Sequence, residues 1–384
     1  MLNFRNFLIR EAMLVDKSKW EKALCKDCVK NINTQEAIQK KDYSSSGLYP
    51  IISQEKEYIS GFTNTSSSLN IGLGDVVIFG DHTRTLKYVD FDFCVGADGV
   101  KVLKPIQSIR PKFLYYYLKW SDIPSNGYSR HYKFLKEVEI KIPSFYEQDI
   151  IVKELDSLQT IIDEYEAQIM DFDELIESVF NQTFGDIAIN EMNWEIIPMG
   201  KLGNFKNGLN YEKGEKGKVL KFIGVGDFQN NKYLSSSDIL STIEVESISE
   251  EYLLKDEDIV FVRSNGNKNL VGRCLEVFPH GTEITYSGFC IRFRKTTNII
   301  NKYLLGVLTN STFKKTHVLK SNGIGIQNIN QKLLSNLPIP IPPIELQKKF
   351  ENLVDSIYAQ KKLIREQLRD AEQLMAERMQ YYFS

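Results

Sequence analysis

Cysteine is scarce in this sequence, and long hydrophobic runs are missing from it. The 384 residues include five cysteines, an odd number that favours reduced thiols over a disulfide framework and so predicts a cytoplasmic location. No run of 18 apolar residues occurs, so no membrane-spanning helix is expected. The first ten residues carry charges at both ends and contain no small-residue cleavage site, so they are not expected to act as a secretory signal.

Sequence signatures of catalysis are also missing. There is no Gly-x-x-x-x-Gly-Lys-Ser/Thr phosphate loop and no Asn/Asp-Pro-Pro-aromatic tetrapeptide of amino-methyltransferases, and the four histidines are scattered. The stretch Phe222–Asp227 contains two glycines of a nucleotide-binding loop but lacks the third glycine and the following helix, so a strand and turn are expected. No nucleophile, base and oxyanion donor can be assembled from the other residues. The chain is therefore predicted to be non-catalytic and to bind no cofactor.

Two further motifs have a metal-binding or catalytic interpretation beside a structural one. Cys25 and Cys28 form a single Cys-x-x-Cys pair, whereas zinc needs a second pair at suitable spacing, which the other three cysteines do not supply. The segment Glu137–Lys141 contains the acid-x-lysine part of a nuclease site but has no evident acidic partner, so an edge strand is expected. No metal site is predicted.

Positive charge is not in excess, but it is unevenly distributed. The whole chain has a net charge of −2. Residues 144–184 contain eleven acidic residues and one lysine, a net charge of −10, whereas residues 345–384 contain seven residues of each sign. The rest of the chain therefore carries +8. Because phosphate is attracted by positive charge, nucleic-acid binding is expected outside these two segments.

Glycine and proline are absent from residues 144–184, and apolar residues recur there at alternating steps of four and three. This heptad pattern predicts a long helix that packs against a partner helix. The seam consists of Ile151, Leu155, Leu158, Ile162, Tyr165, Ile169, Phe172, Ile176 and Val179.

The partner helix is predicted at the C-terminal end of the chain. The segment Ile341–Gln347 repeats Ile142–Gln148 at a shift of 199 residues, and the same shift carries the seam into the second segment. Lys361 interrupts this second seam, and Leu363 beside it is expected to cover part of the gap. The seam consists of Phe350, Val354, Ile357, Lys361, Ile364, Leu368, Ala371 and Met375. Antiparallel packing would bring part of the acidic face of the first helix onto Lys361, Lys362, Arg365 and Arg369.

The regions that precede the two helices also repeat each other. Trp194-Glu195 matches Trp20-Glu21, and Glu257–Phe261 matches Gly74–Ile78. Matching blocks keep their order while their spacing changes, which predicts one fold used twice with variable surface loops. The strand-like runs of the first head are Leu48–Ser53, Asp75–Phe79, Tyr88–Val95 and Val100–Leu103, followed by a helix at Lys112–Trp120.

These patterns predict an α/β (α+β) protein with an internal tandem repeat, in which a pair of long antiparallel coiled-coil helices separates two globular heads. The expected parts are an N-terminal lead at 1–18, a first head at 19–143, a central helix at 144–184, a linker at 185–193, a second head at 194–340 and a C-terminal helix at 341–384. The alternative to this two-headed architecture is a single large domain with two unrelated surface helices.

Polar loops of the two heads are the candidate DNA-binding sites. Asn pairs bidentately with adenine, Arg pairs with guanine, and Ser, Thr and Tyr bind phosphate, although the same residue types also fill ordinary turns. The candidates in the first head are Tyr43, Ser45, Lys56, Asn64, Arg84, Lys87 and Arg130. Those in the second head are Asn207, Asn210, Tyr211, Lys213, Gln229, Asn230, Arg263, Asn265, Asn267, Lys268, Asn322 and Gln327.

The sequence resembles the specificity subunit of type I restriction–modification enzymes from Trp20 to its end. The motifs that carry the resemblance are the two Ile-Pro…Gln entries into long helices, the strand entries at Asp75 and Asp258, and Ser321–Ile329. The first head departs from this pattern at Tyr128–Tyr132, where Gly-Ile-Gln-Asn is replaced and the loop is three residues shorter.

This resemblance implies that the two heads are target-recognition domains, each of which reads one half of a split double-stranded DNA sequence. It also implies that the helices fix the gap and dock two methyltransferase subunits, through which restriction subunits join. S-adenosylmethionine, ATP and magnesium would belong to those partners, and no membrane would be involved.

Two other functional classes remain open. One is a coiled-coil adaptor that never contacts DNA, and the other is a stand-alone nuclease with an unrecognised centre. DNA binding by the intact complex would exclude the adaptor, and DNA cleavage by the isolated chain would identify the nuclease.

Overall fold

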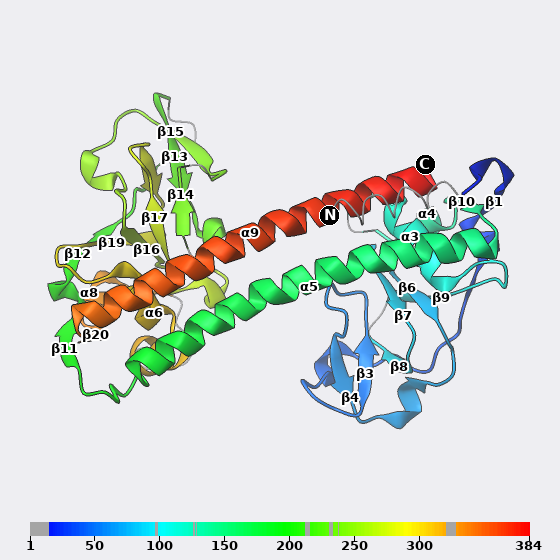
Figure 1. Ribbon diagram of the computed structural model, residues 1–384, viewed down its shortest axis with the longest axis horizontal. Coiled ribbons are helices and arrows are strands. Elements are labelled where there is room, and N and C mark those ends of the chain that lie inside the picture. Colours follow the sequence, from blue (N-terminus) through cyan, green and yellow to red (C-terminus); the bar gives the residue numbers. More distant parts are fainter. Residues whose placement is uncertain are drawn as a thin grey trace. The chain divides into compact units, whose positions relative to one another are not determined.

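The computed structural model describes residues 15–96, 99–125, 127, 129–211, 216–229, 233–236, 238–319 and 328–384, without the side chains of Lys268 and Leu319. The chain divides into two compact units (Figure 1). Unit 1 consists of Met1–Ala167 and Arg365–Ser384, and unit 2 consists of Gln168–Ile364. Each unit therefore contains one head and part of both long helices.

The two long helices begin at repeated motifs. Helix α5 spans Phe145–Phe184 and α9 spans Ile344–Phe383. Ser144 and Glu147 form reciprocal hydrogen bonds at the start of α5, a capping box. Gly185 ends α5 with a φ of 70°, a conformation that glycine adopts without steric cost.

The helices pack antiparallel, as the repeat predicts. In unit 1 the first half of α5 shares a hydrophobic core with the last turns of α9, and Glu154 pairs with Arg378. In unit 2 the second half of α5 packs on the beginning of α9, where Phe180 contacts Phe350 and Asp173 pairs with Lys361. As residue numbers rise along α5, those of its partners on α9 fall.

The expectation that Leu363 covers the gap at Lys361 is wrong. The side chain of Leu363 is 55% exposed, whereas Lys361 is buried and its ammonium lies 2.5 Å from an oxygen of Asp173. An ion pair therefore fills this seam position. Of the other basic residues expected to meet the acidic face, Lys362, Arg365 and Arg369 are all exposed.

Within the described residues, the first head contains two four-stranded sheets and one two-stranded antiparallel sheet. The order of the first sheet is β2-β9-β6-β7 and that of the second is β4-β3-β8-β5, while β1 pairs with β10. The strands are β1 Glu21–Leu24, β2 Val29–Asn31, β3 Tyr49–Ile52, β4 Gly61–Thr63, β5 Leu69–Asn70, β6 Val76–Gly80, β7 Leu86–Val89, β8 Phe93–Val95, β9 Val100–Pro105 and β10 Glu139–Ile142. The helices are α2 Cys25–Cys28, α3 Pro111–Trp120 and α4 Tyr132–Leu135.

The second head has a related plan, with five strands in one sheet and three in the other. Its sheets have the orders β12-β19-β16-β17-β14 and β15-β13-β18, and β11 pairs with β20. The strands are β11 Glu195–Pro198, β12 Gly203–Asn207, β13 Lys218–Ile223, β14 Tyr233–Ser235, β15 Ser241–Val245, β16 Asp258–Val262, β17 Cys274–Phe278, β18 Ile284–Tyr286, β19 Cys290–Lys295 and β20 Pro338–Ile341. The helices are α6 Asn301–Thr309, α7 Ser311–Phe313, a π-helical turn at Lys314–Leu319, and α8 Gln331–Ser335.

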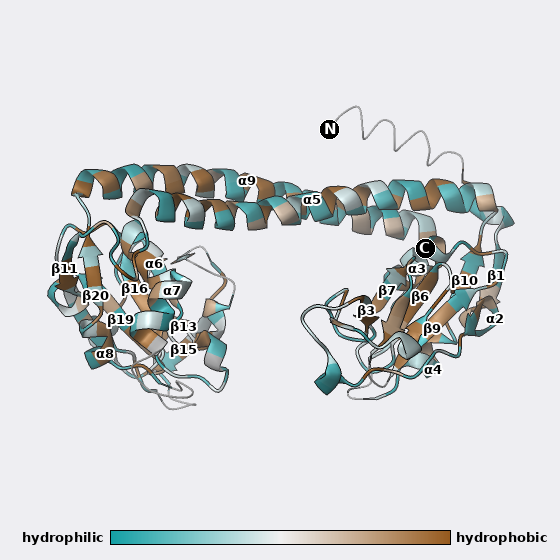
Figure 2. Cartoon of the chain, turned by 90° about the horizontal axis from the view of Figure 1, so that it is seen from below, coloured by the Kyte–Doolittle hydropathy of each residue, from teal (hydrophilic) through white to brown (hydrophobic). Residues whose placement is uncertain are grey.

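Strand β6 shows why each head forms three layers. All five of its residues are buried. Val77 and Phe79 point into the core shared with α3 and the long helices, whereas Val76 and Ile78 point into the core between the two sheets. Strand β16 divides its side chains in the same way. Figure 2 shows both strands as hydrophobic ribbons, as expected for strands covered on both faces.

One predicted strand of the first head is two strands in the structure. The run Tyr88–Val95 is interrupted at Asp90–Asp92, and β7 and β8 belong to different sheets. Asp92 accepts a hydrogen bond from the backbone N–H of Gly72. The polar interruption lets the chain leave one sheet and enter the other.

The repeated glutamine of the two helix entries joins each head to its helix. The Gln148 amide accepts from the N–H of Arg110 at 2.7 Å and donates to the carbonyls of Ser108 and Pro143, both at 2.9 Å. Gln347 accepts from the N–H of Ile300 at 3.0 Å and donates to Pro342. Arg110 and Ile300 are the residues that precede α3 and α6. Both glutamines are buried.

Candidate nucleic-acid interface

A groove in the second head brings together loops from four places in the sequence. It has a volume of about 770 Å³. Its lining residues come from the ends of β12 and β13, from the loop after β16, and from the turn between β18 and β19. They are Tyr211, Phe222, Gly224, Val225, Ser264, Asn265, Gly266, Ser287 and Phe289.

Close backbone contacts hold these loops together. The N–H of Leu209 donates to the carbonyl of Tyr286 and the N–H of Gly288 donates to Leu209, both at 2.8 Å. A β-carbon at Gly208 would lie 2.0 Å from the Ser287 carbonyl oxygen, so a side chain there would separate the loops. The predicted Asn210 lies against Gly288, where a β-carbon would come within 1.9 Å of its amide oxygen.

Side-chain turns order the loop Arg263–Asn269. The amide oxygen of Asn265 accepts from the N–H of Asn267 at 2.7 Å, and that of Asn267 accepts from the N–H of Asn269 at 3.0 Å. An amide oxygen has a second lone pair, so both side chains can still pair with a ligand. The N–H of Arg263 donates to the Phe289 carbonyl at 2.7 Å, which fixes the half-buried Arg263 beside the groove.

Arg273 connects this loop to the segment after β13. Its guanidinium donates to the carbonyls of Gln229 at 2.8 Å and Phe228 at 3.2 Å, and its Nε donates to the Asn269 carbonyl at 3.1 Å. The predicted Gln229 is exposed at this junction. Sequence reasoning missed Arg273 because it lies at the end of the loop that contains the predicted residues, one residue before β17.

The first head joins the equivalent two loops with different residues. The N–H of His82 donates to the Gln54 amide oxygen at 3.1 Å, and the Thr83 hydroxyl donates to the Gln54 carbonyl at 2.7 Å. The predicted Arg84 is exposed, has a φ of 61°, and donates to the Ile123 carbonyl at 2.8 Å. The predicted Arg130 is also exposed, next to His131, whose N–H donates to the Asp81 carbonyl.

Two candidate residues of the first head are engaged inside the protein. Lys87 is 4% exposed, its ammonium donates to the carbonyls of Ser53, Glu57 and Tyr58, and burial lowers its pKa. Tyr43 packs against Ile38, Ile51 and Cys94, its hydroxyl is buried, and burial raises its pKa. Neither polar group is presented to a ligand.

The remaining candidates fall into two classes. Ser45, Lys56, Asn64, Asn207 and Asn267 are exposed, and the Asn64 amide oxygen accepts from the N–H of Leu48. Lys213, Asn230, Asn322 and Gln327 lie outside the described residues, as do the side chain of Lys268 and Tyr128.

The Cys25–Cys28 pair lies in the core of the first head. Both side chains are fully buried, and burial raises the pKa of Cys25 to about 12 and that of Cys28 to about 11. Within the part of the chain that the structure describes, no group of three or more His, Cys, Asp or Glu residues is placed to hold a metal ion. Over the same residues, no helix is long and apolar enough to cross a bilayer.

Two acidic residues in the first part of α5 pair with the first head. Arg110 pairs with Asp149 at 3.0 Å, and Lys112 lies 2.8 Å from Asp156, which also accepts from the Tyr116 hydroxyl. Part of the negative charge of α5 is therefore neutralised by α3 rather than by α9.

Comparison with known proteins identifies the family. The profile of the type I restriction modification DNA specificity domain matches residues 17–171 and 191–373. The specificity subunit of the StySPI enzyme from Salmonella potsdam is 25% identical over 332 residues, which cover 79% of this chain and 69% of the relative. The specificity subunit of the EcoR124I/EcoR124II enzyme from Escherichia coli is 22% identical over 367 residues, 91% of this chain and 89% of the relative.

A solved structure has the same fold. The specificity subunit of the type I system of M. genitalium superposes with a TM-score of 0.54 at 17% identity, over 95% of this chain and 96% of that one. The fold of this chain is therefore a known one. The family profile matches more than half of the sequence, in two successive copies. The chain therefore belongs to the type I restriction–modification DNA specificity family and is the DNA specificity subunit, the non-catalytic part of such a complex.

Proposed function

We propose that each head reads one half of a bipartite double-stranded DNA target. The observation that carries this proposal is the duplicated topology of the heads. In both heads the loop after the central strand, β6 or β16, is connected to the loop after β3 or β13. The residues that make the connection differ, as expected of one scaffold adapted to two sequences.

Exposed and half-buried residues of these loops supply the groups that DNA recognition needs. Unlike Lys87, whose ammonium is bound inside the protein, these side chains keep groups that can bind a ligand. They are Arg84 and Arg130 in the first head and Asn210, Arg263 and Asn265 in the second. Asn and Arg are the side chains that pair bidentately with adenine and guanine in the major groove. Base readout is therefore assigned to the loops, and nonspecific attraction to the net positive charge of the heads.

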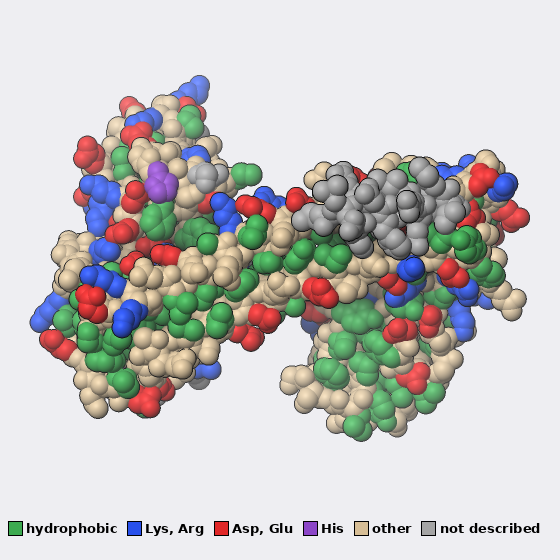
Figure 3. All heavy atoms as spheres, viewed as in Figure 1, with side chains coloured by type: hydrophobic (Ala, Val, Ile, Leu, Met, Phe, Trp, Pro, Cys, Tyr) green, Lys and Arg blue, Asp and Glu red, His purple; other side chains and the backbone are tan. Residues whose placement is uncertain are grey.

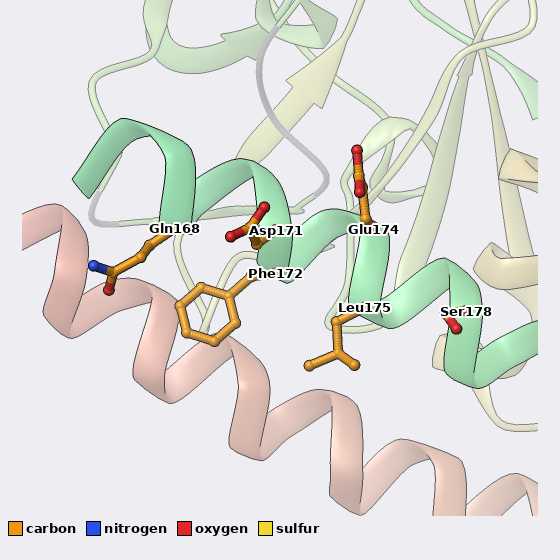
Figure 4. A pocket seen from close by; sticks show the side chains of 6 residues that line it. All are labelled: Gln168, Asp171, Phe172, Glu174, Leu175 and Ser178. Atoms are coloured by element: carbon orange, nitrogen blue, oxygen red, sulfur yellow. The ribbon is translucent and has the colours of Figure 1, made fainter. Parts of the chain in front are cut away.

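We further propose that α5 and α9 set the gap between the half-sites and dock two methyltransferase subunits, through which restriction subunits join. A groove on α5 in unit 2 supports the docking (Figure 4). Phe172 and Leu175 project toward α9, whereas Glu174 points away from it. The groove has a volume of about 550 Å³ and is lined by Gln168, Asp171, Phe172, Glu174, Leu175 and Ser178.

This surface combines apolar and acidic groups. Leu175 is 45% exposed and Met170 is 66% exposed, and α9 exposes Leu353 and Leu363 in the same unit. Figure 3 shows hydrophobic side chains on the exposed surface of the long helices, with acidic side chains beside them. A partner element with apolar and basic residues fits such a surface, because acidic residues would attract its charges and exposed leucines would be covered.

The test of the docking surface is a charge substitution outside the core. Leu175→Lys is expected to reduce recovery of methyltransferase subunits with the tagged chain, while the isolated chain keeps its thermal unfolding midpoint. Val219→Lys is the matched control, because Val219 is 64% exposed on the second head. Equal recovery with both variants would contradict docking at this groove.

The test of the reading function is an exchange of heads. Residues 19–143 are replaced by the first head of another family member, and methylated sites are mapped in a genome that expresses the hybrid with its partners. One half of the methylated sequence is expected to change, while the other half and the gap are kept. A change in both halves would contradict separate reading, and DNA binding without sequence preference would favour an adaptor.

A cytoplasmic location is part of the proposal. It is supported by five cysteines that are all buried and unpaired by disulfides, the state expected in a reducing compartment.

A further inference from the structure

A phenylalanine is exposed in the groove of the second head. Phe289 is the last residue of the turn between β18 and β19, and 63% of its side chain is accessible. Its backbone is held on both sides: the carbonyl accepts from the N–H groups of Arg263 and Ser264, and its N–H donates to the Ser287 hydroxyl at 3.2 Å. The ring is therefore presented to solvent from a fixed position, where exposure is unfavourable in the free protein.

Polar side chains share the groove with this ring. Asn265, Ser264 and Ser287 line the same groove. The groove is also lined by Tyr211 and Phe222, whose rings meet edge to face with 5.2 Å between their centroids. The groove thus combines the amide of Asn265, the hydroxyls of two serines and one tyrosine, and an exposed apolar group.

This combination matches one type of base-pair edge. In the major groove an A·T pair presents a hydrogen-bond donor and acceptor on adenine and the 5-methyl group on thymine, whereas a G·C pair has no methyl group. An asparagine pairs with the adenine edge, and an apolar side chain such as Phe contacts the methyl group. Asn265 and Phe289 supply both partners from neighbouring loops.

We propose that Phe289 contacts the 5-methyl group of a thymine in the second half-site and that Asn265 reads an adenine of the same or the adjacent base pair. This inference rests on the proposed function of the second head. It makes Phe289 a specificity-determining residue through contact with a base edge. A ring that instead wedges between base pairs would bind by unstacking them and would not depend on the methyl group.

The decisive measurement changes the DNA rather than the protein. The intact complex is bound to short duplexes that carry its mapped site, and each thymine of the second half-site is replaced singly by deoxyuridine, which removes only the methyl group. One replacement is expected to weaken binding about 4-fold, the loss expected for one buried methyl-sized group. Replacements in the first half-site leave contacts of this groove unchanged and serve as controls.

Variants then assign the effect to the ring. With Phe289→Ala, affinity for the thymine duplex is expected to fall by a similar factor, and the difference between thymine and deoxyuridine at that position to disappear. Phe289→Leu keeps an apolar contact and is expected to retain most of the difference. Ile196→Ala is the matched control, because Ile196 is 51% exposed on β11, outside the groove.

Three outcomes would overturn the proposal. They are a second half-site without an A·T pair, a wild-type complex that ignores every deoxyuridine replacement, and a Phe289→Ala complex that loses affinity equally for both duplexes. If the Phe289→Ala chain does not assemble into the complex, the deoxyuridine series with the wild-type complex and with Phe289→Leu still tests the proposal. None of these outcomes affects the proposed function of the second head, which is contradicted when base-pair changes in the second half-site leave binding unchanged.

Discussion

Arg263 illustrates how one residue of the second head can be assigned to base or phosphate. Arg263→Ala is expected to weaken binding of the correct half-site by about 1–3 kcal/mol, because a bidentate contact to guanine is lost. The measurement is affinity of the intact complex for the cognate duplex and for duplexes altered at each position, at several salt concentrations. Specificity should relax at one position only.

The control for this variant is Lys201→Ala, an exposed basic residue away from the groove. A loss that is equal on all sequences and accompanied by a shallower salt dependence would make Arg263 a phosphate contact. Unchanged affinity would remove the residue from the interface.

A buried ion pair in unit 1 carries a prediction about stability. The Glu154 side chain is fully buried and accepts from the Arg378 guanidinium and the Tyr382 hydroxyl. Arg378→Met is expected to lower the free energy of unfolding by about 3–5 kcal/mol, because it leaves a buried carboxylate without its cation. Thermal and denaturant unfolding measure this loss.

The double variant Glu154→Gln, Arg378→Met provides the internal control. It removes both charges, so it is expected to recover part of the stability that Arg378→Met loses. If the double variant instead loses as much stability as the single variants Glu154→Gln and Arg378→Met lose together, the two side chains are not coupled and this account is contradicted.

At the scale of the element, the glutamine of each helix entry is the predicted weak point. Gln148→Leu removes the partner that the buried glutamine amide gives to the N–H of Arg110 and to the carbonyls of Ser108 and Pro143. We expect a loss of about 1–3 kcal/mol in the free energy of unfolding, and a similar loss for Gln347→Leu in unit 2. Gln360→Leu, at an exposed position of α9, is the matched control.

Hydrogen exchange separates this explanation from a general loss of stability. The amides at the start of α3 should exchange faster in Gln148→Leu, and those at the start of α6 in Gln347→Leu. Equal stability of the wild type and both variants would show that the repeated glutamine has no structural role.

At the scale of the whole molecule, the proposed spacing function can be tested by length. One heptad inserted after Ile162, with its antiparallel counterpart in α9, adds roughly 10 Å of helix at about 1.5 Å per residue. Because B-DNA advances about 3.4 Å per base pair, the preferred gap should lengthen by about three base pairs. Methylation mapping or binding to a series of gap lengths measures the shift.

Affinity is expected to fall even where the longer gap is preferred. Three base pairs rotate one half-site by nearly a third of a DNA turn, whereas a heptad rotates the helical seam by only about 20°. Inserting four residues instead breaks the seam and should unfold the helix pair. If the heptad variant folds and binds DNA but keeps the original gap preference, the spacing hypothesis is contradicted.

Some of this architecture was determined by the sequence alone. Heptad spacing along α5 and the 199-residue repeat predicted two long antiparallel helices and two related heads, because helical periodicity and internal duplication are visible in local sequence. Helical periodicity is a property of neighbouring residues, and a duplication is found by comparing the sequence with itself, so neither needs knowledge of distant contacts in the fold.

Tertiary structure alone decided which polar groups are buried and which loops meet. Lys361 can occupy the seam because it pairs with Asp173, a residue 188 positions away in sequence. Lys87 is buried because its ammonium binds backbone carbonyls, one of them 30 positions away. The groove that joins Asn265 to Phe289 and Tyr211 exists because β12, β13, β16 and β18 end near one another. The pairing of strands brings these loops together. The type of a single residue in the sequence does not reveal which distant residues will lie beside it.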